Sequence, residues 1–321
     1  MNNQRAIPAY VLSGLKKLKD DLDTKIPPKQ VDRNVMISTW NIRAFGDYTD
    51  KWNASKDDSP KRDLQSILYI SEIISRFDVV AVQEVKANIK ALKTLMEFLG
   101  DHWSFILTDV TKGASGNGER MAYLFDTRRV QLSGLASELV VPKEELKKID
   151  ENALTEQFAR TPYAVSFKID KKSFILVTLH ILYGKNRKAR IPELKAIADW
   201  LSDWGKDSNV YDKNLIALGD FNIEKRGDLL HETFISSGLY IPGDMQTENM
   251  TRSIFDETKF YDHIAWFMGD NGSPRLSLEY IRGGNYDFVG NTTFRGEITK
   301  RELSWKISDH YPLWAEFSIR D

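Results

Sequence analysis

Four apolar segments of the chain border polar side chains that can bind a metal ion or transfer a proton. An ionised carboxylate beside a buried strand costs several kcal/mol unless it is paired or metal-bound. One such residue is easily a satisfied structural group, but four segments with the same pattern favour a functional site. The side chains are Asn41 and Arg43 after the first segment, Glu84 after the second, Asp220 and Asn222 after the third, and Asp309 and His310 before the last.

The oxygen-bearing side chains in this set suit a hard divalent cation. The chain has no cysteine, which excludes thiolate ligands, disulfides and thiolate catalysis. Carboxylate and amide oxygens favour Mg²⁺, with Mn²⁺ or Ca²⁺ as alternatives. Because Mg²⁺ keeps several waters and meets substrate phosphates directly, the set predicts a metal-dependent enzyme that acts on phosphate esters.

Two of the five histidines have contexts that suggest acid–base chemistry. His180 ends an apolar strand, and His310 follows Asp309 directly. A lone histidine at a strand end is more often a satisfied core residue, but two of them with carboxylates available make an acid–base pair plausible. His102 and His231 lie in helical contexts without such a signal, and His263 is ambiguous.

Bulk composition is that of an ordinary water-soluble globular protein. The 321 residues are 41% hydrophobic and 28% charged, with a net charge of −1. No apolar run approaches the ~18 residues of a membrane span, and no signal peptide is visible. We therefore expect a cytoplasmic protein if the chain is full length, and a secreted one if a signal has been removed. No protein partner can be inferred. The basic run at residues 185–190 is read as a solvated helix entry rather than a DNA-binding patch.

Strand-like and helix-like segments alternate from residue 35 onward, without a linker, which predicts one α/β domain over residues 35–321. Residues 1–34 form a separate appendage, with a short amphipathic helix at 11–18 that Pro27 and Pro28 end. The three-to-four spacing of apolar residues predicts helices at residues 63–74, 89–99 and 192–204. Strands are predicted at 35–42, 78–85, 121–125, 163–169, 174–180, 215–221, 263–268 and 313–319.

The polar segments, taken in order, resemble the endonuclease/exonuclease/phosphatase superfamily, and within it the pancreatic-type deoxyribonuclease I branch. The resemblance covers about residues 35–321. It is carried by residues 40–46 (WNIRAFG), 78–85 (DVVAVQEV), 119–125 (ERMAYLF), 158–162 (FARTP), 177–180 (VTLH), 219–222 (GDFN), 261–264 (YDHI) and 308–312 (SDHYP).

The resemblance implies a four-layer α/β sandwich, made of two packed mixed sheets flanked by helices, with the site at one end of the sheets. It also implies a DNA endonuclease of low sequence specificity and a role for each candidate residue. Glu84 is the principal metal carboxylate, completed by Asn41 and Asp309. Asp220 and Asn222 orient the attacking water and bind the scissile phosphate. His180 and His310 flank the phosphate, with Glu119 and Asp262 as their respective carboxylate partners. Arg160 and Arg43 are further phosphate contacts.

The sequence departs from relatives that cut duplex DNA. Those relatives carry an aromatic residue before the Glu-Arg segment and an arginine after Gln-Glu-Val, whereas this chain has residues 113–118 (GASGNG) and Lys86. His263 stands where relatives usually carry arginine. Two alternatives therefore stay open beside the DNA endonuclease: a phosphoesterase acting on phospholipid, inositol phosphate, nucleotide or RNA, and a non-catalytic binding module.

Overall fold

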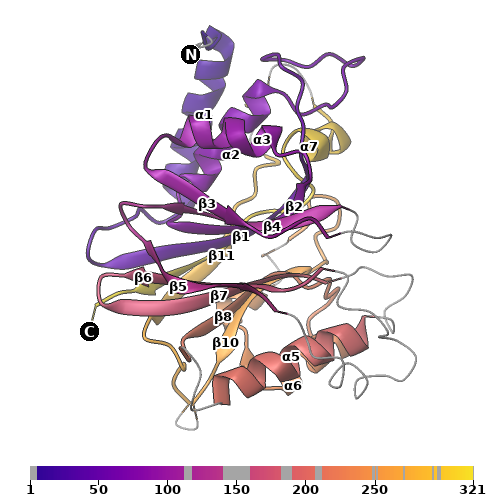
Figure 1. Ribbon diagram of the computed structural model, residues 1–321. Helices are drawn as coiled ribbons and strands as arrows, with labels where there is room; N and C mark the ends of the chain where they lie inside the picture. The colour runs from indigo at the N-terminus through magenta and orange to yellow at the C-terminus, as the bar shows by residue number, and fades with distance from the viewer. Residues whose placement is uncertain are drawn as a thin grey trace.

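Two six-stranded sheets pack face to face, and helices cover their outer faces (Figure 1). This is the four-layer α/β sandwich that the resemblance implied, and the prediction is confirmed. The computed structural model describes residues 6–111, 118–139, 160–181, 190–206, 212–247, 250, 252–269, 272–290, 293–294 and 298–320.

The first sheet has the order β11-β12-β1-β2-β4-β3. Its β1 and β2 are parallel, and the other neighbours pair antiparallel. Helices cover its outer face (Figure 1). The bounds are β1 Asn34–Phe45, β2 Val79–Lys86, β3 Trp103–Leu107, β4 Glu119–Asp126, β11 Glu279–Asn285, β12 Leu313–Ser318, α1 Ala9–Lys25, α2 Leu64–Ile74, α3 Lys90–Leu99 and α7 Lys300–Lys306.

The second sheet has the order β5-β6-β7-β8-β10-β9, and here β7 and β8 form the parallel pair. Helices α5 and α6 cover its outer face (Figure 1). The bounds are β5 Gln131–Glu138, β6 Tyr163–Ile169, β7 Lys172–His180, β8 Leu215–Asp220, β9 Leu239–Tyr240, β10 Asp262–Phe267, α5 Ile191–Lys206, α6 Leu229–Ser236 and the 3₁₀ turn η2 Gly243–Gln246.

Three apolar clusters correspond to the three contacts between the four layers. One joins α1, α2 and α3 to the first sheet, one lies between the sheets, and one joins the second sheet to α5 and α6. The alternation of side chains along a strand explains this division. In β1, Met36 faces the helices while Val35 and Ile37 face the other sheet. Strands buried on both faces are continuously apolar, which is why the sequence shows them clearly.

The N-terminal segment packs against the first sheet's helices. Helix α1 is longer than the predicted residues 11–18, because Leu22 continues its apolar stripe beyond Leu18 and is buried. A Cβ on Gly14 would lie 2.0 Å from the Tyr69 hydroxyl, so glycine permits the close approach of α1 to α2. Beyond the helix, the Lys29 ammonium lies 3.2 Å from the Asp126 carboxylate at the end of β4.

Candidate functional site

The sheet topology brings the predicted site residues to one edge of the sandwich. Strands β1 and β2 run parallel and end near Asn41 and Glu84, while β7 and β8 run parallel and end at His180 and Asp220. Strand β10 runs antiparallel to β8, so its first residue, Asp262, pairs with Asp220. Strand β12 runs antiparallel to β1, which places Asp309 and His310, just before β12, at the same edge.

Asn41 connects the carboxylates of the two sheets. Its Nδ2 donates to Glu84 Oε1 at 3.2 Å and to Asp220 Oδ2 at 3.0 Å. Glu84 Oε2 accepts a second hydrogen bond from the Ala44 amide at 2.8 Å. Asn41 is 1% exposed, yet its Oδ1 has no hydrogen-bond partner among the described residues. A buried, unsatisfied amide oxygen on a residue whose amide nitrogen bridges two carboxylates fits a site for a divalent cation.

The backbone aims Glu84 into the site. The pairing of β2 with β4 shifts register between Val82 and Val85, and Glu84 adopts a left-handed conformation with φ of 61°. Bulges of this kind redirect a side chain and are common beside active sites. Gly219, with φ of 144°, serves a related purpose, because a Cβ there would lie 2.1 Å from the Leu179 carbonyl oxygen.

His310 is held by a buried carboxylate. Its Nδ1 lies 2.8 Å from Asp262 Oδ2, and its Nε2 lies 3.9 Å from Asp220 Oδ2. Burial opposes a charge on the ring, but the neighbouring charge of Asp262 outweighs it and raises the pKa of His310 to about 10. Burial raises the pKa of Asp262 in turn. His310 therefore carries the proton of this pair at neutral pH.

His180 has a similar place on the other side of Asp220. Its Nδ1 lies 3.3 Å from Glu119 Oε2, without hydrogen-bond alignment, and its Nε2 lies 3.7 Å from Asp220 Oδ2. Arg160 Nε donates to Glu119 Oε2 at 2.6 Å, and Lys86 Nζ donates to Oε1 at 2.9 Å. Burial alone would raise the pKa of Glu119, but His180 and these cations lower it to about 2. Glu119 is thus an anion between three basic side chains.

The other predicted phosphate contacts already have protein partners. Asn222 donates its backbone N–H to Asp220 Oδ1 at 2.9 Å and its side-chain Nδ2 to the Ile181 carbonyl at 2.7 Å. Arg43 Nη1 donates to Ser304 Oγ at 2.8 Å and lies 3.6 Å from Asp309 Oδ2. These bonds fix the positions of Asn222 and Arg43 at the site.

His263 lies outside the site, buried beside the Phe221 and Phe234 rings. Its burial lowers the pKa well below the ordinary value, so it stays neutral. The GASGN stretch at 113–117, Phe158 and Ala159, and residues 185–189 of the basic run lie outside the described residues. Arg190, the end of that run, is buried and donates to the Asn222 carbonyl at 2.8 Å.

Sequence reasoning missed Arg62, which supports the site from behind. This buried side chain donates four hydrogen bonds to main-chain carbonyls beside the site, at 2.7 to 3.1 Å. No strand-end or motif signal marks it in the sequence. The carbonyls that Arg62 binds belong to Arg43, Ala44, Lys306 and Ile307.

Ser308 also supports the site, although the sequence analysis gave it no role. Its Oγ donates to the Asn41 carbonyl at 2.6 Å and accepts from the Arg43 amide.

Asp220, Asp262 and His310 also have potential ligand atoms within 4.8 Å of one another. The short Asp262–His310 hydrogen bond engages Nδ1, and a cation there would have to displace it. We therefore interpret this trio as a proton-handling group. A buried oxygen without a hydrogen-bond partner among the described residues occurs at both places, Oδ1 of Asp262 in the trio and Oδ1 of Asn41 beside Glu84, so Asn41 and Glu84 are a second candidate position for a cation.

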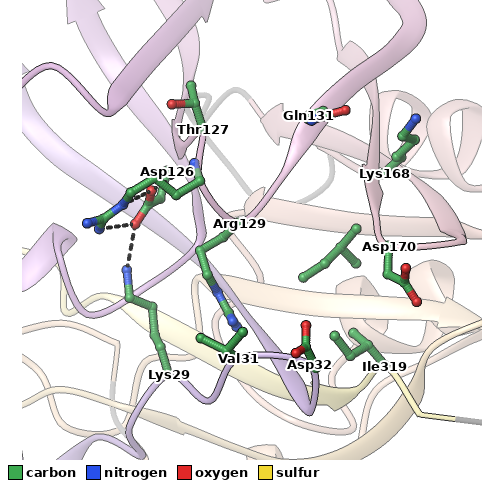
Figure 2. A pocket seen from close by; sticks show the side chains of 12 residues that line it. Lys29, Val31, Asp32, Asp126, Thr127, Arg129, Gln131, Lys168, Asp170 and Ile319 are labelled. Atoms are coloured by element: carbon green, nitrogen blue, oxygen red, sulfur yellow. Dashed lines mark hydrogen bonds and ion pairs between the residues drawn. The ribbon is translucent and has the colours of Figure 1, made fainter.

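A pocket of about 620 Å³ at the opposite edge of the sandwich has a different character (Figure 2). Its charged groups largely neutralise one another. Asp126 accepts from Arg128 at 2.7 Å and from Lys29 at 3.2 Å, and Arg129 donates to Asp78 at 3.0 Å. These pairs tie β4 to the segment after α1, so the pocket is best explained as a structural junction.

The candidate site thus combines two histidine–carboxylate pairs around one aspartate with an amide and a glutamate, an arrangement that suits hydrolysis of phosphate esters. The sequence model of the Endonuclease/Exonuclease/phosphatase family matches residues 38–310, and the chain belongs to this family. It is therefore an enzyme of the phosphoesterase and nuclease class, as the sequence predicts. The family generally uses divalent metal ions.

Individual relatives agree with this assignment. A deoxyribonuclease of Thioalkalivibrio sp. (strain K90mix) is 28% identical over 306 residues, covering 90% of this chain and 73% of that protein. Deoxyribonuclease-1 of Bos taurus is 25% identical over 296 residues, covering 88% and 92%. A mannosyl-6-phosphatase of Bacteroides thetaiotaomicron VPI-5482 superposes with a TM-score of 0.58 at 20% identity, covering 88% of this chain and 99% of that one. At that identity the structural likeness shows the fold alone. Across the described residues, every helix is too short or too polar to span a bilayer.

Proposed function

We propose that the protein is a divalent-metal-dependent DNA endonuclease of low sequence specificity. The observation that carries the proposal is the arrangement around Asp220. Two histidines approach one of its oxygens, at 3.7 and 3.9 Å, and each has its own buried carboxylate behind it. The names of the deoxyribonuclease relatives support DNA as the substrate.

Glu84, Asn41 and Asp309 hold the cation, for which Mg²⁺ is the expected ion. When bound, the cation neutralises negative charge on the phosphate oxygens. The protein prepares this position in advance, since Glu84 is fixed by the Ala44 amide and Asn41 lies between Glu84 and Asp220. Preorganised ligands reduce the reorganisation that catalysis would otherwise require.

The two histidines handle protons and charge at the scissile phosphate. Protonated His310 donates to a phosphate oxygen or to the leaving oxygen, since its Nε2 faces Asp220 while Asp262 holds Nδ1. Asp220 lies within reach of both rings and orients the attacking water, with Asn222 held beside it. Arg43 and Arg160 add positive charge at the two ends of the site. Proton transfer by a positioned side chain contributes typically ~10²–10⁴-fold to the rate.

Nicking of supercoiled plasmid tests the proposal directly. The protein is incubated with plasmid and Mg²⁺ or Mn²⁺, with and without EDTA, beside His310→Ala. We expect nicks that EDTA abolishes and that His310→Ala reduces by at least about 10²-fold. Metal-dependent hydrolysis of a small phosphodiester, without cleavage of either the plasmid or single-stranded DNA, would refute the DNA assignment.

A phosphoesterase acting on another substrate is the second candidate. Lys86 stands where duplex-cutting relatives carry arginine, and it is bonded to Glu119. The fold is also shared with a mannosyl-6-phosphatase. Release of phosphate from sugar or inositol phosphates at a higher kcat/KM than cleavage of DNA would favour this candidate. If the folded protein hydrolyses no phosphate ester at all, the remaining candidate is the non-catalytic binding module.

A further inference from the structure

A groove next to the proposed metal position ends on an exposed tryptophan. Trp305, on α7, is 41% exposed, which is unusual for so large an apolar side chain. It lines a cavity of about 640 Å³ together with Ala44, Pro60, Lys61, Lys86 and Arg301, among others. We call this cavity the Trp305 groove. Its volume is within the range of roughly 300–1,000 Å³ that is usual for ligand pockets.

Two residues that line the groove are hydrogen-bonded to carboxylates of the candidate site. Ala44, on its wall, donates the amide hydrogen bond that fixes Glu84. Lys86, on the same wall, donates to Glu119, the partner of His180. A substrate strand whose phosphate lies at Asp220 therefore has a neighbouring part within reach of the groove.

Arg43 holds the indole in place from one side. Its guanidinium lies 3.8 Å from the centroid of the Trp305 ring, and its Nη1 donates to Ser304 on the same helix at 2.8 Å. Arg43 does not line the groove, whereas Trp305 does. The ring is thus fixed by a cation on one face and presents its remaining exposed surface to the groove.

The charges around the groove complement a nucleic acid backbone. Lys61, Lys86 and Arg301 contribute cations to the wall, and its two carboxylates have protein partners. Lys86 is also paired with Glu119, and Lys61 donates to the Lys56 carbonyl. Asp47 lies 2.9 Å from the Lys90 ammonium, and Glu302 accepts the Thr299 amide at 3.0 Å in a helix cap. Aromatic rings within a cationic groove are the usual means of binding single strands.

We propose that the Trp305 groove binds an unpaired nucleotide of the substrate strand, with its base stacked on the Trp305 indole. A base inside a duplex has both faces covered by its neighbours, so this subsite selects single-stranded, frayed or gapped DNA. The inference rests on the proposed DNA endonuclease activity and specifies its substrate class.

The test combines base removal with variants of Trp305. The substrate is a single-stranded oligonucleotide with one phosphodiester among phosphorothioate linkages. A single abasic residue is placed at each position near that linkage in turn. Cleavage rates are measured with Mg²⁺ for the wild type, Trp305→Ala, Trp305→Phe and Leu229→Ala. Leu229 is 59% exposed on α6, far from the groove, and serves as the matched control.

A stacked base contributes on the order of 5- to 150-fold in binding. We expect one abasic position to slow the wild type by a factor in this range. Trp305→Ala cleaves the intact strand more slowly by a similar factor and is insensitive to that abasic position. Trp305→Phe keeps most of the sensitivity, and Leu229→Ala behaves like the wild type.

An unchanged abasic profile in Trp305→Ala, with wild-type urea unfolding, would overturn the stacking proposal while leaving the nuclease intact. A wild type that cleaves no DNA at all would instead refute the proposed function. A duplex cleaved faster than the matching single strand, by wild type and Trp305→Ala alike, would also count against the groove.

Discussion

Replacing Arg62 by methionine should destabilise the protein and disorganise the site together. Arg62 is 3% exposed and uses four N–H donors on the carbonyls of residues 43, 44, 306 and 307. Hydrogen bonds from a charged donor contribute about 1.5–3 kcal/mol each, or roughly 6–12 kcal/mol if they were additive. Burial opposes this gain. It lowers the pKa of Arg62 to about 10, although Glu84 and Asp309 support the charge, and this fall corresponds to about 3 kcal/mol.

Coupled contacts are worth less than their sum, so we expect Arg62→Met to lower the free energy of unfolding by about 3–5 kcal/mol. Urea unfolding at neutral pH measures this change, and kcat on DNA should fall as well, because the residue 43–44 segment positions Glu84. Arg282→Met is the matched control, since Arg282 is largely exposed and its ion pair among the described residues is with Glu316 at the sheet edge. A loss below about 1 kcal/mol for Arg62→Met would refute this account of the four bonds.

Three further substitutions separate metal binding, catalysis and stability. Glu84→Gln should raise the Mg²⁺ concentration for half-maximal activity by at least the ~10–100-fold that loss of an outer-shell partner costs; an unchanged metal titration would show that the ligand assignment is wrong. Glu119→Gln should lower kcat/KM by about 10²-fold, whereas Glu97→Gln, at an exposed position of α3, should have no effect. Asp126 is buried, but Arg128 and Lys29 lower its pKa to about 2, so it stabilises the fold above about pH 4 and loses this effect as the pH falls towards 2. Asp126→Asn should therefore cost about 1–2 kcal/mol in urea unfolding at pH 6 and about a third of that at pH 2.5; an equal cost at both pH values would contradict the linkage.

The central strands could be predicted because they are buried on both faces. The predicted strand at residues 163–169 coincides with β6, and the one at 78–85 differs from β2 by one residue at each end. Strands β5 and β11 were missed, because they lie at sheet edges and are largely exposed. An edge strand buries little side-chain surface, so its sequence lacks the apolar run on which the prediction depends. The short helices α6 and α7 were missed for a related reason, since each has only about two turns of periodicity.

The candidate site could be located from the sequence to the extent that strand ends determine it. His180 and Asp220 close their strands, and Asn41 and Glu84 lie near the ends of theirs, so their proximity at one edge follows from topology. The assignment of separate roles came from the family resemblance. Arg62 could not be found either way, because its partners are backbone carbonyls. Any sequence supplies such acceptors, and only the tertiary fold brings these four around one guanidinium.

Backbone conformation decides the rest of the site geometry, and it too is hidden in the sequence. Ala44, Glu84 and Asn222 all have positive φ values, of 46°, 61° and 51°, although none is glycine. Such conformations cost about 1–2 kcal/mol each for residues with a side chain. Ala44 directs its amide to Glu84, Glu84 its carboxylate to Asn41, and Asn222 its amide to Asp220. Three strained residues that all serve one cluster of carboxylates indicate that the fold stabilises them for chemistry, because packing alone would be satisfied by relaxed turns.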